Sequence, residues 1–266
     1  MNDSAEYVPY TQIAGMLPIC KGDILYVISD ILDLAKSCRD NSERFECEKF
    51  INSLQEAVGD CGTLMFPTFN WDFCEGQVFD YRKTKGKTGV LGNTALKMPG
   101  FKRTQHPLYS FAVWGKFQRD IIKLDNKSGF DAISPFGYMH KNNAKALVVG
   151  LTASTGNTFI HYVEQAVGVD YRYDKDFCAP YIDEFGNIES RTYSMYVRDL
   201  DIDPKRTSYF AIDDVMSILG ICKNFSINSV PFHVIKLPGM FEVVSLELRY
   251  NGAKNLYSFA KERQPD

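Results

Sequence analysis

A histidine and a glutamate three positions apart form the first group of residues that can do chemistry. His161 and Glu164 follow a loop of threonine, serine and glycine, and the residues around them predict a helix that begins at Asn157 or Thr158. Side chains three residues apart lie on neighbouring parts of one helix face. An imidazole beside a carboxylate suits general-base catalysis. The alternative is an ordinary helix that carries one surface histidine.

A second histidine, His106, lies directly before Pro107 and four residues before Ser110, where the chain enters a predicted strand. Proline biases the preceding backbone towards an extended conformation, which places this histidine in a loop. It either holds a ligand beside the serine hydroxyl or braces the loop. The lysines and glycines of residues 84–92 suit contact with an anion, such as a phosphate near a pantetheine arm, or form a solvated turn. They do not match the spacing of a P-loop.

Three other chemistries lack their sequence signatures. Two of the four histidines together with Glu164 would suit zinc, but the H-E-x-x-H helix is absent. No G-x-S-x-G elbow of a serine hydrolase occurs, and none of the seven cysteines belongs to a C-x-x-C pair. We therefore expect no metal, no acyl-cysteine intermediate and free thiols.

The elements that must position these residues alternate between strands and helices. This alternation predicts an α/β fold with a mixed central sheet and flanking helices. A helix predicted over residues 45–58 ends at Gly59, where a C-terminal glycine is expected. Strands are predicted over residues 23–28, 63–67, 111–114 and 146–150.

The C-terminal third has a different pattern. A turn at residues 185–187 predicts an antiparallel hairpin between residues 181–182 and 190–197, and alternation predicts a further strand over residues 241–250. We therefore expect residues 1–266 to form one domain, with 178–266 as a candidate, partly antiparallel subdomain.

Composition narrows the class of protein. The 266 residues are 45% hydrophobic and 24% charged, which excludes a disordered chain, a coiled coil and a collagen-like repeat. The net charge of −3 gives no basic excess for binding nucleic acid. No apolar run approaches the length of a membrane span, and the start of the chain does not look like a signal peptide. We expect a soluble, cytoplasmic protein with no nucleic-acid or membrane partner.

Six short blocks in a fixed order carry a resemblance to a known family. They resemble the aminoglycoside 3-N-acetyltransferase family, which also contains acyltransferases that act on nucleotide-linked amino sugars, and the similarity spans about residues 22–172. The blocks are L-M-F-P-T-F at 64–69, T-G-V-L at 88–91, H-P-L-Y-S-F-A at 106–112, S-P-F-G at 134–137, V-G at 149–150 and T-F-I-H-Y-V-E at 158–164.

This resemblance implies an acyl-CoA-dependent N-acyltransferase with an α/β fold unlike the GNAT fold. The co-substrate would be acetyl-CoA or another short-chain acyl-CoA, without a metal. His161 would take the proton from the amine as it attacks the thioester, without an acyl-enzyme. A downstream carboxylate orients this histidine in relatives. Asp199 is the best match, followed by Asp201, and Glu164 is the local alternative, which would otherwise contact the substrate amine.

The resemblance also implies a cofactor site along one edge of the sheet. Thr68 and Ser110 are the candidates for contacting the acyl oxygen as negative charge develops there. The residues expected to bind the cofactor are Ser29, Asp30, Thr68, Gly89, Val90, His106 and Ser110.

The acceptor is expected to be a small-molecule amine. Tyr171 and Arg172, with Tyr173 and Lys175 close by, would suit the base and diphosphate of a nucleotide-linked amino sugar, or would form a charge-balanced loop. The alternative function is an aminoglycoside 3-N-acetyltransferase that confers antibiotic resistance. A catalytically silent CoA-binding protein is the alternative from another class. We expect a monomer or a homodimer.

Overall fold

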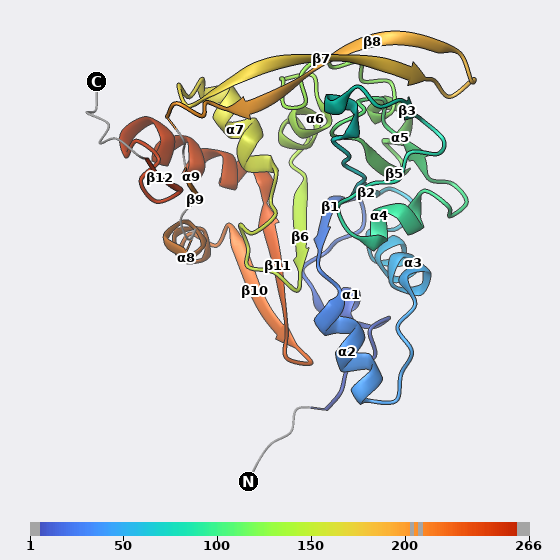
Figure 1. Ribbon diagram of the computed structural model, residues 1–266. Helices are drawn as coiled ribbons and strands as arrows, with labels where there is room; N and C mark the ends of the chain where they lie inside the picture. The colour runs from blue at the N-terminus through green and yellow to red at the C-terminus, as the bar shows by residue number, and fades with distance from the viewer. Residues whose placement is uncertain (1–5, 203–204, 207–209, 260–266) are drawn as a thin grey trace.

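A seven-stranded mixed sheet organises the molecule, and its strands follow the order β10-β11-β6-β1-β2-β5-β4 (Figure 1). The computed structural model describes residues 6–202, 205–206 and 210–259. The strands of this sheet are β1 (Ile24–Ser29), β2 (Thr63–Pro67), β4 (Lys102–Arg103), β5 (Phe111–Gly115), β6 (Lys145–Val149), β10 (Cys222–Ile227) and β11 (Val230–Lys236).

The centre of the sheet is parallel. β1 pairs with β2 on one side and with β6 on the other, so the carboxyl ends of all three strands lie at the same edge. Each strand is a short apolar run buried on both faces, as central strands of a parallel sheet should be. Ligands bind at this edge in open α/β sheets.

Helices cover both faces of the sheet, and β1 shows the division residue by residue. Tyr26 and Ile28 point into the core beneath α6, α7 and α9, whereas Leu25 and Val27 point into the core beneath α1 to α4. This period of two is the signature of a strand buried between two helical layers. The helices are α1 (Ile13–Met16), α2 (Leu32–Asp40), α3 (Cys47–Val58), α4 (Val90–Ala95), α5 (Gln118–Ile121), α6 (Pro135–Lys141), α7 (Phe159–Val167), α8 (Phe210–Ile218) and α9 (Leu237–Tyr250), with the 3₁₀ helix η1 (Asp72–Glu75).

Antiparallel strands complete the sheet at both edges. β5 and β4 extend it beyond β2, and β11 and β10 extend it beyond β6. The predicted α/β class with a mixed central sheet is thus confirmed. The strands β10 and β11, which lie in the C-terminal third of the chain, belong to this same sheet. Much of the 178–266 segment therefore shares the main core.

A long hairpin crosses one end of the molecule (Figure 1). β7 (Arg172–Ile182) and β8 (Ile188–Arg198) pair along their whole length, which confirms the predicted hairpin and extends it. The short strand β3 (Phe79–Asp80) joins β7, and β9 (Lys205–Arg206) pairs with β12 (Tyr257–Ser258) elsewhere.

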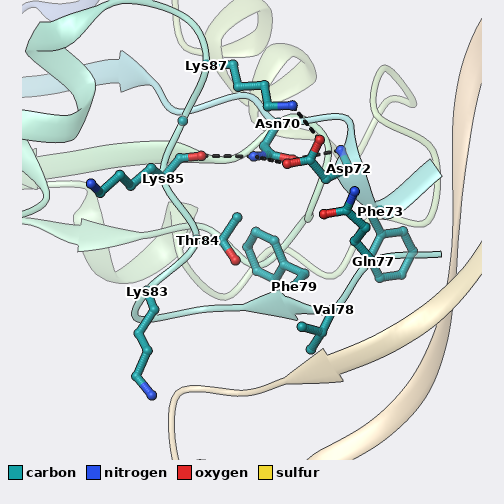
Figure 2. Close-up of a pocket in the computed structure, with 11 residues that line it drawn as sticks. Asn70, Asp72, Phe73, Gln77, Val78, Phe79, Lys83, Thr84, Lys85 and Lys87 are labelled. Carbon is teal, nitrogen blue, oxygen red and sulfur yellow. Dashed lines mark hydrogen bonds and ion pairs between the residues drawn. The ribbon is translucent and has the colours of Figure 1, made fainter. Parts of the chain in front are cut away.

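Between η1, β3 and residues 83–87, a pocket of about 420 Å³ opens to solvent (Figure 2).

The strand predicted over residues 241–250 is wrong, because these residues lie in α9. An alternating strand would place Leu246 and Tyr250 on the same face as the buried Leu248, but both are exposed. The apolar residues that are buried recur every three or four positions, which is the period of a helix packed on one side. They are Leu237, Met240, Val243, Val244 and Leu248.

None of the helices within the described ranges is both long enough and apolar enough to cross a membrane.

Candidate active site

The helix α7 begins where β6 leaves the carboxyl edge of the sheet. Gly150 has a φ of 71°, and a Cβ there would lie 2.1 Å from the carbonyl oxygen of Asp30, so only glycine allows this close approach to the end of β1. The side-chain oxygen of Asn157 accepts a hydrogen bond from the amide of Phe159 at 3.3 Å. These contacts fix the start of α7 over the edge where β1 ends.

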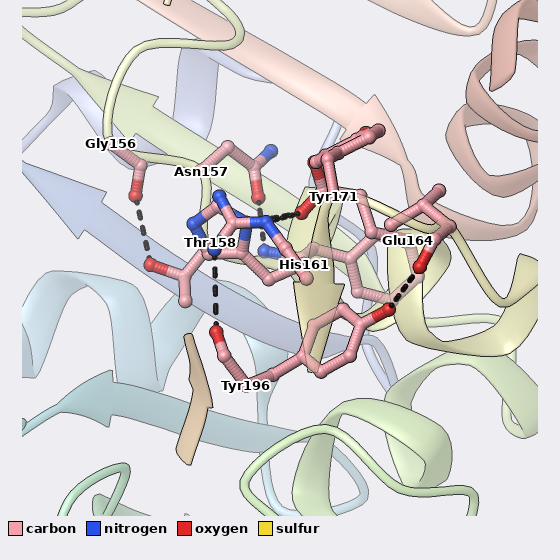
Figure 3. Close-up of polar contacts among 10 residues, drawn as sticks. Gly156, Asn157, Thr158, His161, Glu164, Tyr171 and Tyr196 are labelled. Atoms are coloured by element: carbon pink, nitrogen blue, oxygen red, sulfur yellow. Dashed lines mark hydrogen bonds and ion pairs between the residues drawn. The ribbon is translucent and has the colours of Figure 1, made fainter. Parts of the chain in front are cut away.

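His161 and Glu164 meet on α7 as their spacing predicts (Figure 3). Nδ1 of His161 lies 2.6 Å from Oε2 of Glu164. Because a carboxylate only accepts hydrogen bonds, Nδ1 carries a proton, and in the neutral imidazole Nε2 then carries the lone pair. The imidazole side chain is 30% exposed, so this nitrogen belongs to a ring that solvent and ligands can reach.

Glu164 is completely buried and is held from three sides. Nε of Arg172 lies 2.8 Å from Oε2, and the Tyr171 hydroxyl donates to Oε1 at 2.9 Å. Burial acts to raise the pKa of Glu164, but His161 and Arg172 outweigh it and hold this pKa below its usual value. The carboxylate therefore stays ionised and fixes the orientation of the imidazole.

Tyr171 and Arg172, which the sequence analysis expects to bind the substrate, lie against Glu164. Tyr171 is 1% exposed and the Arg172 side chain 8% exposed, and both are engaged with Glu164. Neither presents a surface to a diphosphate. Tyr173 and Lys175 lie beyond them on β7, with Tyr173 half exposed. Tyr171 and Arg172 thus position the carboxylate that in turn positions His161.

Asp199 follows the end of β8. Its amide donates to the carbonyl oxygen of Tyr171, and its carboxylate accepts a hydrogen bond from the amide of Asp201 at 2.9 Å. The carboxylate that contacts His161 is that of Glu164, the local alternative from the sequence.

Phe130 is a neighbour of the site that the sequence did not reveal. Its ring meets the imidazole of His161 edge to face, with 5.6 Å between ring centroids. The hydroxyl of Ser128 anchors the same loop by donating a hydrogen bond to Asp174 at 2.8 Å. The side-chain amide of Gln165, on α7, donates to both Ser128 and Asp174. Local sequence patterns do not predict this contact, because the loop that carries Phe130 and the helix α7 are far apart along the chain.

The hydroxyls of Thr68 and Ser110, which the resemblance implies contact the acyl oxygen, are turned inward in this structure. Both residues are fully buried, and their hydroxyl oxygens lie 2.9 Å apart. Ser110 also donates to the carbonyl oxygen of Thr68 and accepts from Nε of Arg103, each at 3.0 Å. These contacts satisfy both hydroxyls inside the protein and connect the end of β2 to the start of β5.

His106 braces its loop, which was the other interpretation of its position. Its Nδ1 accepts from the amide of Tyr109, and its Nε2 faces the carbonyl oxygen of Lys127, each at 3.2 Å. Nε2 therefore carries the proton. Burial lowers the pKa of His106 to about 4, so the ring is neutral at physiological pH. It connects the strand entrance to the loop that carries Phe130.

The neutral state of His106 predicts a loss of stability in acid. An unfolded histidine has a pKa of about 6.5, so the unfolded chain takes up this proton before the folded chain does. The free energy of unfolding should therefore fall between about pH 6.5 and 4, by up to about 3 kcal/mol. Urea unfolding at neutral pH and near pH 4.5 measures this loss in wild type and in His106→Gln. The variant should lose less than wild type, and equal losses would show that another group is responsible.

The remaining predicted cofactor residues gather at the open edge of the sheet. Ser29 ends β1 and Asp30 follows it, while Gly89 precedes α4 and Val90 begins it. A Cβ on Gly89 would lie 3.5 Å from the carbonyl oxygen of Ser29, which shows how closely the two segments approach. Asp30 and Val90 are exposed, so this edge is accessible to a ligand.

Metal-binding residues do not gather at this site. Across the described part of the chain, no three His, Cys, Asp or Glu side chains are arranged to hold a metal ion.

The class of protein follows from comparison with known families. A family model described as aminoglycoside 3-N-acetyltransferase matches residues 37–248. The chain belongs to this family.

Comparisons with individual proteins agree with this assignment. Aminoglycoside N(3)-acetyltransferase IV from Salmonella sp is 29% identical over 127 residues, a match that covers 46% of this chain and 46% of that relative. Three solved structures show the same fold. They are AAC-IIIb in a binary complex with CoASH (TM-score 0.76, 17% identity, 97% of this chain and 100% of that chain), AAC-VIa bound to sisomicin (0.74, 15%, 91% and 98%) and YokD from Bacillus subtilis (0.73, 18%, 94% and 96%).

Proposed function

We propose that this protein transfers an acetyl group from acetyl-CoA to an amine of an aminoglycoside-type amino sugar. The observation that carries the proposal is the partly exposed imidazole of His161, paired with the buried Glu164 at the carboxyl edge of the sheet. The family assignment and the solved AAC-IIIb complex with CoASH support the identity of the acyl donor.

The proton transfer follows from the orientation of the ring. Nδ1–H donates to Glu164, so Nε2 accepts a proton from the substrate amine as its nitrogen attacks the thioester carbonyl. A bond from nitrogen to the acyl carbon forms, and the bond from that carbon to sulfur breaks. The proton on Nε2 then passes to the departing thiolate. This sequence needs no acyl-enzyme and no metal.

Glu164 stabilises the imidazolium that forms when Nε2 takes up the proton. Arg172 and Tyr171 keep the carboxylate ionised and fixed, so it does not reorient during the reaction. In this proposal Glu164 takes the orienting role first assigned to Asp199.

An aminoglycoside-type acceptor has better support than a nucleotide-linked amino sugar. The case for a nucleotide rested on Tyr171 and Arg172, and both are buried against Glu164. The curated relative from Salmonella sp is an aminoglycoside acetyltransferase, and the AAC-VIa structure holds sisomicin.

Release of free thiol from acetyl-CoA tests the proposal across a panel of amines. The panel contains aminoglycosides, free amino sugars and nucleotide-linked amino sugars. Turnover with one of the first two classes supports the proposed acceptor. Turnover confined to nucleotide-linked sugars would replace it, and binding of acetyl-CoA without turnover on any amine would favour a silent CoA-binding protein.

A further inference from the structure

The pocket between η1, β3 and residues 83–87 is lined by an unusual set of side chains (Figure 2). Phe73 and Phe79 are buried aromatic residues, and Lys83, Lys85 and Lys87 are exposed cations. The volume of about 420 Å³ is in the range of small-ligand sites. The pocket therefore combines a lining of aromatic and polar side chains with a positively charged rim.

Carboxylates compensate only part of this charge. Lys87 is paired with Asp72, and Nζ of Lys83 lies 3.7 Å from Asp80. Lys85 forms no ion pair with any of the residues that the structure describes, and its carbonyl oxygen, not its ammonium group, is held by Asn70 at 2.9 Å.

A buried guanidinium that contacts two residues of the pocket lining adds a further positive charge. Arg103 is 2% exposed and donates to neutral acceptors, which are the carbonyl oxygens of Thr84 and Thr68 and the hydroxyl of Ser110. Its Cζ lies 4.7 Å from the ring centroid of Phe79.

No carboxylate of the described residues comes within ion-pairing distance of Arg103. Asp80 interacts with the guanidinium electrostatically, but from a longer distance. Burial lowers the pKa of Arg103 to about 10, so it is charged at neutral pH. Buried charges are normally paired. This one contacts Thr84 and Phe79, which line a pocket whose rim is also cationic.

The backbone of the pocket is fixed before any ligand arrives. Asn93 bonds to both the amide and the carbonyl oxygen of Gly86, each at 2.8 Å. A Cβ on Gly86 would lie 2.7 Å from the Cα of Thr68, so this segment packs against the loop after β2 without room for a side chain. A rim held in this way loses little conformational entropy when a ligand binds.

We propose that this pocket binds a phosphoryl group, with Lys85 and Lys83 as the contacting cations and Arg103 as a fixed charge behind them. Lysine is a common phosphate ligand, and compact anions are stabilised by several converging cations. Such a group is carried by the CoA donor or by a phosphorylated acceptor. The binding step itself does not depend on the proposed acetyl transfer.

Titration calorimetry with inorganic pyrophosphate tests the site without any reaction. The double variant K83S/K85S should bind pyrophosphate about tenfold more weakly than wild type, or worse, because two converging charges are lost. The matched control K97S/K123S removes two exposed lysines that do not line the pocket, and its affinity should equal that of wild type. Equal weakening in both double variants, or no binding to wild type, would overturn the proposal.

Competition then identifies the source of the phosphoryl group. Displacement of pyrophosphate by CoA but not by uridine diphosphate assigns the site to the donor, and the reverse result assigns it to a phosphorylated acceptor. The His161→Asn variant should bind pyrophosphate as wild type does. Failure of the proposed acetyl transfer is therefore distinguishable from failure of the proposed phosphoryl site. Loss of binding in that variant would contradict a site separate from the catalytic histidine.

Discussion

Replacing His161 with asparagine should lower kcat by about 10²–10⁴-fold, the usual contribution of a positioned general base. Asparagine keeps a polar side chain on α7 but cannot accept a proton from the amine. Binding of acetyl-CoA and the free energy of unfolding should stay close to those of wild type, because the imidazole is partly exposed and not a member of the core. Steady-state thiol release measures the effect on turnover.

His233→Asn provides the matched control. His233 lies on β11, where its Nδ1 contacts Asn224, and it has no part in the contacts around α7. This variant should keep near-normal turnover. A His161→Asn enzyme that also keeps near-normal kcat would show that the proposed base is not the base.

Replacing Glu164 with glutamine should impair both turnover and stability. The change removes the anion that pairs with Arg172 and His161 while keeping the shape of the side chain. A buried guanidinium is then left without its carboxylate, which typically costs about 3–5 kcal/mol. We expect a free energy of unfolding lowered by that order and a kcat lowered by at least about tenfold. Urea unfolding and thiol release measure the two effects.

Asp199→Asn separates the two carboxylates that the sequence offered. Its contacts are those of a turn at the end of β8, so turnover and stability should change little. A large loss of kcat in this variant, with Glu164→Gln near normal, would return the orienting role to Asp199.

Local patterns in the sequence predicted the part of the fold that carries the site. β1, β2 and β6 are short apolar runs of β-forming residues, and such runs are buried strands wherever helices separate them. The pairing of His161 with Glu164 followed from helical spacing, because the geometry of a helix fixes which side chains meet.

Contacts made by distant segments were not predictable in this way. The charged segment at the start of β7 looks like a solvated loop, yet its first residue, Arg172, is buried by the carboxylate of α7. Thr68 and Ser110 belong to blocks that marked the family, but the pairing of β2 with β5 turns their hydroxyls inward. Burial of a polar side chain depends on its partner, and partners are set by tertiary structure.

The prediction for α9 failed for a different reason. Its apolar residues satisfy a period of two and a helical period at once, so the pattern alone does not decide between them. Packing of α9 against α7 and α6 selects the helix.

A crystal structure of the ternary complex with CoA and an amino-sugar acceptor tests the central claim most directly. The measured quantity is the distance from the acceptor nitrogen to Nε2 of His161. Hydrogen-bonding contact at about 2.7–3.2 Å, with the CoA sulfur beside that nitrogen, is the predicted result. An acceptor nitrogen bound against a different base, with the imidazole turned away from both substrates, would contradict it.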